Sequence, residues 1–196
     1  VEQGAKITLS NTAMALRMGG VNELGEKLGA KVIPADATSV EDLQKVFEES
    51  IEALGGKIDF VLHSIGMSPN VRKNIPYDDL NYNFLEKTLD VSAISFHKMM
   101  QVAKKMDAVS EGGSILAIDS NNDLASIARS FGYVYGRDKK VRVNTISQSP
   151  TPTTAGEGIS GMNAFLDFAD KMSPLGNATA DECADYAIVM FSDYTK

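Results

Sequence analysis

The stretch Ile58-Asp-Phe-Val-Leu-His-Ser-Ile-Gly66 is an apolar segment that runs into a turn of small residues. An apolar run of this length predicts a buried strand, and in open α/β sheets the turn after such a strand binds a dinucleotide. Residues 30–38 repeat the pattern, with an apolar strand that ends at Asp36. A segment with apolar residues at helical spacing, 40–54, connects the two. This order predicts a Rossmann-type α/β fold: a doubly wound parallel sheet with helices on both faces.

The alternation of strands and helices continues along the chain. The expected strands are 5–10, 31–35, 58–65, 113–119 and 141–147. The expected helices lie near 20–29, 40–54, 82–107, 124–136, 163–172 and 179–191, and Val1–Gly4 is interpreted as the tail of another. Because 58–62 and 114–118 are largely apolar rather than alternating, we expect helices to cover both faces of the sheet there. The loop Ser149–Gly156 follows a strand end and is interpreted as a ligand loop rather than a linker.

Composition narrows the class of protein. The 196 residues are 43% hydrophobic and 23% charged, which favours one globular domain over 1–196. A net charge of -7 argues against a nucleic-acid-binding surface. The lone Cys183 excludes an internal disulfide and is typical of a reducing cytoplasm. No apolar run is long enough to span a membrane and no signal segment opens the chain, so we expect a cytoplasmic protein without membrane or metal sites.

Four motifs stand in a characteristic order. They are Pro34-Ala-Asp-Ala-Thr38, His63-Ser-Ile-Gly66, Leu89-Asp-Val-Ser-Ala-Ile-Ser95, and Arg142–Pro150 with Thr151 to Ala155 behind it. Together they resemble the bacterial enoyl-acyl-carrier-protein reductases, divergent short-chain dehydrogenase/reductases that use NADH. Most of that superfamily carries Asn-Asn-Ala-Gly where this chain has His63-Ser-Ile-Gly66. The sequences of residues 67–70 and 172–176 are similar to those of the Bacteroides-type branch.

The resemblance implies an activity and partners. The expected reaction is NADH-dependent reduction of trans-2-enoyl-acyl-carrier-protein in fatty-acid elongation, by a homotetramer. The cofactor-binding residues that the resemblance implies are Thr12, Asp36, Ala37, Ser64, Ile65, Gly66, Thr151, Pro152, Thr153, Thr154 and Ala155. Asp36 and Ala37 would contact adenine, although Asp36 is also a candidate helix N-cap. Arg17 would favour the 2′-phosphate of NADPH, but the resemblance favours NADH.

Other cofactor and substrate residues have alternatives as well. Thr12 would hold a ribose hydroxyl or be an ordinary loop residue, and the loop 151–155 would hold nicotinamide and pyrophosphate or be a ligand-free turn. Segment 156–168 resembles the flexible flap over the acyl chain. The substrate-binding residues expected are Ser68, Ile159, Met162 and Phe165. His63 and His97 are interpreted as packed side chains rather than catalytic ones.

The family's catalytic residues are missing from the chain. In the family a tyrosine hydroxyl and a lysine stabilise the enolate that hydride transfer creates. Here strand 113–119 passes through 119–126 directly into the next helix, and Tyr133 and Tyr135 lie at its far end. No catalytic residue is therefore assigned, and the chain as written is expected to be inactive. The interpretation is a reductase domain incomplete at both ends and near 119–126; the alternative is a non-catalytic reductase scaffold that acts as a binding or assembly module.

Overall fold

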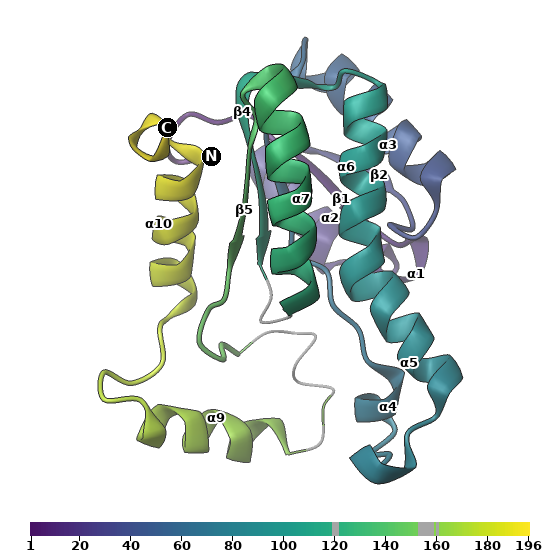
Figure 1. The fold of residues 1–196 in the computed structure, drawn as a ribbon, viewed down its shortest axis with the longest axis vertical. Helices are drawn as coiled ribbons and strands as arrows, with labels where there is room; N and C mark the ends of the chain where they lie inside the picture. The colour runs from purple at the N-terminus through teal and green to yellow at the C-terminus, as the bar shows by residue number, and fades with distance from the viewer. Residues whose placement is uncertain (119–121, 153–158, 160) are drawn as a thin grey trace.

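The computed structural model describes residues 1–118, 122–152, 159 and 161–196 (Figure 1). The strands are β1 (Thr8–Asn11), β2 (Lys31–Pro34), β3 (Ile58–His63), β4 (Val109–Ile118) and β5 (Arg142–Ile146). The longer helices are α2 (Gly20–Leu28), α3 (Val40–Leu54), α5 (Tyr82–Leu89), α6 (Ser95–Lys105), α7 (Asn122–Lys139), α9 (Met162–Met172) and α10 (Ala180–Phe191). Short helical turns are α1 (Ala13–Leu16), α4 (Pro69–Arg72), η1 (Tyr77–Asp79), η2 (Asp90–Ile94) and η3 (Asp193–Thr195). Each expected strand and each expected long helix is present.

The strand pairings within the described residues are parallel, as the strand-helix-strand order predicts. β1 pairs with β2, and β3, β4 and β5 form a second sheet in that order. In the second sheet, Leu62 pairs with Leu116, which pairs in turn with Asn144. Because these strands run parallel, the segments that follow them leave the sheet at the same edge. This edge is where α/β folds place their ligands.

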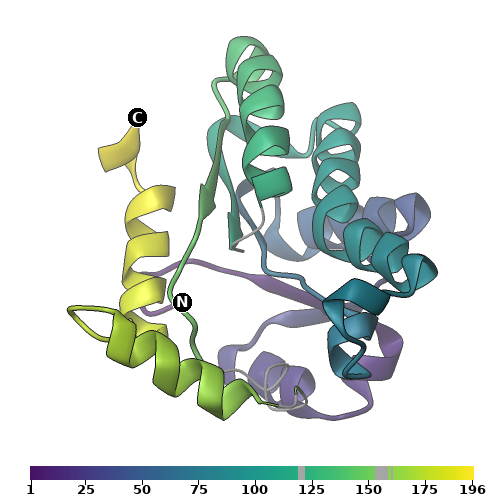
Figure 2. The ribbon, with the colours of Figure 1, turned by 60° about the horizontal axis from the view of Figure 1, so that its bottom comes forward.

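Helices cover both faces of the central strand β4. Helices α6 and α7 lie on one side of β4 and β5 and α10 lies on the other, in both views of the ribbon (Figures 1 and 2). On β4, Ile115 and Ala117 belong to the core cluster beneath α3, α6 and α7, whereas Leu116 packs with Ala187 of α10. All three β4 side chains are fully buried. The expectation that 114–118 is apolar because both faces are covered is therefore confirmed.

The same expectation is wrong for β3. Phe60 and Leu62 are 47% and 51% exposed, while Ile58 and His63 are buried. Phe60 does meet the ring of Phe191, the last residue of α10, with centroids 5.2 Å apart, but it stays nearly half exposed. β3 is largely apolar, yet it is only partly covered here.

Local signals set the helix ends. Ser39 caps α3 by accepting a hydrogen bond from Asp42 N at 3.1 Å, and Gly55 ends the helix with φ +80°, which favours glycine. Thr179 and Glu182 form a capping box at the start of α10. Val1–Gly4, in contrast, form a turn closed by a 2.8 Å bond from Gly4 N to Val1 O rather than a helical tail. The expectation for that segment is wrong, because a glycine at positive φ closes turns as readily as helices.

The expected helix 82–107 is a continuous run with an irregular centre. α5 leads into a π-helical turn, η2, and then into α6, which ends at Lys105. π-turns inside α-helices occur frequently at functional sites. No helix in the described ranges combines the length and apolar character needed to cross a membrane.

Candidate functional site

His63 closes β3 as a buried, neutral side chain. It is 1% exposed, its ring lies 5.1 Å from that of Phe96, and its Nε2 is 2.8 Å from Ser95 Oγ. The Ser95 hydroxyl donates its proton to Val91 O at 2.7 Å, so it accepts from His63, and Nε2 carries the imidazole hydrogen. Burial lowers the pKa of His63 to about 4. The ring therefore stays uncharged at neutral pH and anchors the strand end to helix α6, in line with the interpretation as a packed residue.

The turn after β3 is held by the π-helical turn. Ser92 Oγ of η2 accepts from Met67 N at 3.1 Å and donates to Met67 O at 3.3 Å. Between His63 and Met67, Ser64 and Gly66 are exposed and Ile65 is partly buried. A Cβ built on Gly66 would meet no atom within 4 Å. The backbone of this turn is thus fixed at both ends and open beside its glycine. A ribose that packs against the backbone would need such an open surface.

Asp36 and Ala37 follow β2 in a tight turn. Asp36 Oδ1 accepts from Thr38 N at 2.9 Å and from Thr38 Oγ1 at 2.7 Å, while Oδ2 makes no hydrogen bond to another described residue. These bonds from Thr38, with a smaller contribution from the charges of Lys87 and Lys98, lower the pKa of Asp36. Ala37 packs against the core. Since Ser39 caps α3, Asp36 is not needed as N-cap and presents an ionised oxygen that is free to accept from an adenine amino group.

The structure brings the turns at Asp36 and Ser64 against one segment. Lys98 of α6 donates to Thr38 O at 2.8 Å, and Ser92, six residues earlier, holds Met67. Thr12 lies beyond β1, where it is exposed and caps α1 by accepting from Ala15 N at 3.3 Å. Its hydroxyl proton has no acceptor among the described residues.

The loop after β5 leaves the same sheet edge. Thr151 is partly buried and donates to Ser149 O at 3.1 Å, and Pro152 is exposed. Ser149 Oγ in turn accepts from Ala178 N at 2.7 Å, which ties the loop to the start of α10. Thr153, Thr154 and Ala155 lie outside the described residues. Their expected contacts to nicotinamide and pyrophosphate stay predictions.

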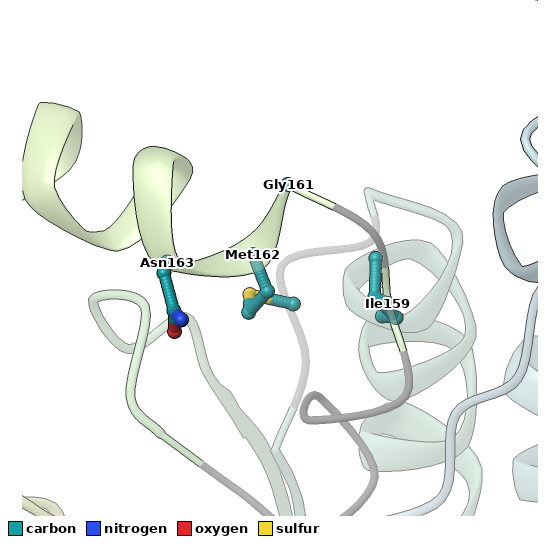
Figure 3. Close-up of a pocket in the computed structure, with 4 residues that line it drawn as sticks. All are labelled: Ile159, Gly161, Met162 and Asn163. Carbon is teal, nitrogen blue, oxygen red and sulfur yellow. The ribbon is translucent and has the colours of Figure 1, made fainter.

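Two of the expected acyl-binding residues share a pocket. Ile159 and Met162 line it together with Gly161 and Asn163, at the start of α9 (Figure 3). Phe165 is 54% exposed and is not among its lining residues. Ser68 lies elsewhere, as the N-cap of α4, where it accepts from Val71 N. The described ranges contain no cluster of His, Cys, Asp or Glu that could hold a metal ion.

Comparison with known proteins decides the family. A family model described as enoyl-(acyl carrier protein) reductase matches residues 1–196. The chain belongs to this family. Among curated members, the enoyl-acyl-carrier-protein reductase (NADH) 2 of Rhizobium meliloti is 30% identical over 88% of this chain and 74% of its own length. FabI of Bacillus subtilis is 26% identical over 100% of this chain and 81% of its own length.

A solved member of the enoyl reductase family has nearly the same backbone. The FabI–NADH complex from Alistipes finegoldii is 56% identical, with a TM-score of 0.94 over 99% of this chain and 74% of the other. A second crystal structure of FabI from the same organism gives a TM-score of 0.90 at 54% identity, over 99% of this chain and 76% of the other. These matches confirm both the doubly wound α/β fold and the resemblance recognised in the motifs.

Sequence reasoning missed the residues that hold the turns. Ser92 and Ser95 lie in the motif 89–95, which gives them no individual role, and Lys98 lies outside every motif. The signal available was two serines three positions apart on an apolar helix, where a buried hydroxyl requires a partner. Their partners lie 25 and 32 positions away, so the pattern could not identify them.

Proposed function

We propose that this protein performs the reaction of its family: NADH-dependent reduction of trans-2-enoyl-acyl-carrier-protein to acyl-acyl-carrier-protein in fatty-acid elongation. One observation carries the proposal. The ionised Asp36 turn and the open Ser64–Gly66 turn lie against the same helix, α6 with its π-turn, in a chain 56% identical to a FabI solved with NADH. A dinucleotide with adenine at the first turn and ribose at the second fits these residues.

Each part of the cofactor would have its own contacts. Asp36 Oδ2 accepts from the adenine amino group, and Thr12 donates to a ribose hydroxyl. The backbone at Ser64, Ile65 and Gly66 supports the nicotinamide ribose, and the loop 151–155 holds the carboxamide and pyrophosphate. Bound NADH supplies the hydride that reduces the enoyl double bond. The chain's own residues bind and orient; none of them is assigned a proton transfer.

The acyl chain would lie against the apolar start of α9. Ile159 and Met162 already line a pocket there, and Phe165 is exposed one turn along the same helix. Contact with an acyl tail would remove these side chains from water and would exclude water from the reacting carbon. Ser68 is the polar candidate at the turn after β3.

We further propose that residues 1–196 belong to one reductase domain that lacks the family's Tyr- and Lys-bearing segment near 119–126. The exposure of Phe60 and Leu62 supports this, since a parallel sheet is normally covered on both faces. Without the tyrosine and lysine the chain would bind NADH but not turn it over. The alternative, a non-catalytic scaffold, is less favoured, because residues 1–196 match the enoyl reductase family model and 88% of the chain aligns with a named NADH-dependent reductase.

Assembly and location complete the proposal. Ile94 and Tyr133 are 46% and 69% exposed, which fits burial in a homotetramer of two-fold symmetry. The unpaired Cys183 fits a cytoplasmic protein.

Calorimetric titration with NADH tests the cofactor assignment on the 196-residue chain. We expect saturable binding that Asp36→Ala weakens by about tenfold, the value of one charge-assisted hydrogen bond. The matched control is Asp78→Ala, an exposed carboxyl in η1, which should leave the affinity unchanged. Failure of the unmodified chain to bind NADH would overturn the proposed function.

A further inference from the structure

Lys98 bridges two segments that lie far apart in the sequence. Its Nζ donates to Thr38 O at 2.8 Å and to Asp90 Oδ1 at 2.9 Å, across 60 and 8 positions. The Lys98 and Asp90 side chains are 27% and 34% exposed. An ion pair shielded to this degree, with one donor shared by a backbone carbonyl, is stronger than a surface pair.

The bridged carbonyl belongs to the turn that presents Asp36. From the other side, Asp42 Oδ2 of α3 accepts from Asp36 N at 2.7 Å. Within the turn, Asp36 Oδ1 is occupied by Thr38. The turn is therefore fixed at its start by α3 and at its end by α6, and Asp36 Oδ2 has no hydrogen-bond partner among the described residues.

Asp90 connects this bridge to the helical turn that also holds the Ser64–Gly66 turn. It begins the π-helical turn, whose Ser92 bonds to both backbone atoms of Met67. A shift of this turn would move the Thr38 carbonyl and the Met67 backbone together. The distance between the two halves of the site thus depends on one short helical segment.

We propose that Lys98, held by Asp90, is a positioning residue that fixes the Asp36–Thr38 turn for the adenine end of the cofactor. This rests on the proposed function, because it assigns adenine to that turn. Lys98 contacts the turn through a carbonyl and would not touch NADH itself. Its loss would weaken adenine recognition and leave recognition of the nicotinamide half unchanged.

The experiment measures binding to the 196-residue chain by calorimetry, with NADH, ADP-ribose and reduced nicotinamide mononucleotide as separate probes. Lys98→Met should weaken NADH and ADP-ribose by about tenfold and leave the mononucleotide within twofold. Lys98→Arg, which keeps the charge and donors, should restore most of the loss. Lys105→Met is the matched control, an exposed lysine on the same helix without an ion pair among the described residues, and should change none of the three.

A double-mutant cycle separates positioning from a general loss of structure. If Lys98 acts through Asp36, then Lys98→Met should cost little in an Asp36→Ala background, because coupled residues are not additive. Asp90→Asn supplies a second route should Lys98→Met fail to fold, and it should show the same adenine-selective loss. Equal weakening of all three probes, or additive effects in the cycle, would overturn the inference. If the unmodified chain binds NADH and Lys98→Met binds it with the same affinity, the inference about Lys98 is overturned and the proposed function stands. If the unmodified chain does not bind NADH, the proposed function is overturned as well.

Discussion

His63 Nε2 and Ser95 Oγ are joined by a buried 2.8 Å hydrogen bond that ties the end of β3 to the start of α6. The serine proton goes to Val91 O, so the bond requires a neutral imidazole with its hydrogen on Nε2. The end of β3, just before the Ser64–Gly66 turn, is therefore fixed by a histidine that must stay uncharged.

This bond predicts a pH dependence of stability. The pKa of His63 is about 4 in the folded protein against 6.5 for the free side chain. The unfolded chain gains a proton below pH 6.5 and the folded one does not, so the free energy of unfolding should fall between pH 6.5 and 4, by roughly 3 kcal/mol in all. Urea unfolding at pH 7, 6 and 5 measures it.

His63→Gln should remove this slope between pH 6.5 and 5, and His97→Gln should retain it. His97 is the matched control because it is the chain's other histidine and lies on the same helix as Ser95. It is exposed, with one ring contact to Phe131, so the expectation of a packed side chain is wrong for His97. An unmodified chain whose unfolding free energy is flat over this range would show that His63 is not buried as described.

Ser92 should matter to both stability and cofactor affinity. Ser92→Ala leaves Met67 N and Met67 O without their partner, at a cost of about 1–3 kcal/mol if water does not replace it. NADH affinity should fall in parallel, because the Ser64–Gly66 turn loses its distal anchor. Urea unfolding and NADH titration measure the two effects, with Ser130→Ala, an exposed serine of α7, as control. A stable variant with unchanged NADH affinity would contradict the anchoring role.

Arg142 should be needed to dock the C-terminal helix. Its guanidinium donates to Met190 O at 3.0 Å and to Phe191 O at 3.1 Å, at the end of α10, and also bonds to Thr195. Arg142→Met removes these charge-assisted bonds and should cost about 1.5–3 kcal/mol in the free energy of unfolding. Arg137→Met, an exposed arginine of α7, should cost little. Equal losses from the two substitutions would mean that α10 does not depend on Arg142.

Phe165 should discriminate between acyl chains. In a version that carries the family's tyrosine and lysine, Phe165→Ser should lower kcat/KM for long enoyl thioesters more than for crotonyl, by about 1–3 kcal/mol if the ring is buried by the acyl tail. NADH affinity should stay unchanged, because Asp36 is on another element. Leu175→Ser, a 97% exposed apolar residue beyond the end of that helix, is the control. A loss that does not depend on chain length would exclude Phe165 from the acyl site.

The fold was predictable where structure depends on local pattern. The periodicity of 40–54 and the apolar run 58–65 correspond to α3 and β3 within two residues at either end, because burial of one face repeats along the element itself. The turns after β2 and β3 were recognised from motifs for the same reason. The prediction that failed, coverage of β3 on both faces, depended on residues distant in the sequence. Phe60 and Leu62 are exposed because of what does not pack against them, and no spacing within the strand reports that.

The hydrogen bonds that hold the site could not be predicted, because they join residues 25 to 60 positions apart. Ser92 with Met67, Ser95 with His63, and Lys98 with Thr38 each need the three-dimensional arrangement before either partner has a role. From sequence alone, a serine or lysine on an amphipathic helix is assigned to the polar face of that helix. The candidate site is therefore predicted residue by residue, whereas the contacts that hold it are found only in the fold.

NADH oxidation with a trans-2-enoyl thioester on acyl carrier protein tests the central claim most directly. Two proteins are compared: the 196-residue chain, and the same chain with the Tyr- and Lys-bearing segment expected of the family placed between β4 and α7. We predict that the first binds NADH without oxidising it and that the second oxidises NADH with the enoyl thioester and not with a ketone. Turnover by the unsupplemented chain, or reduction of ketones by the restored one, would contradict the account.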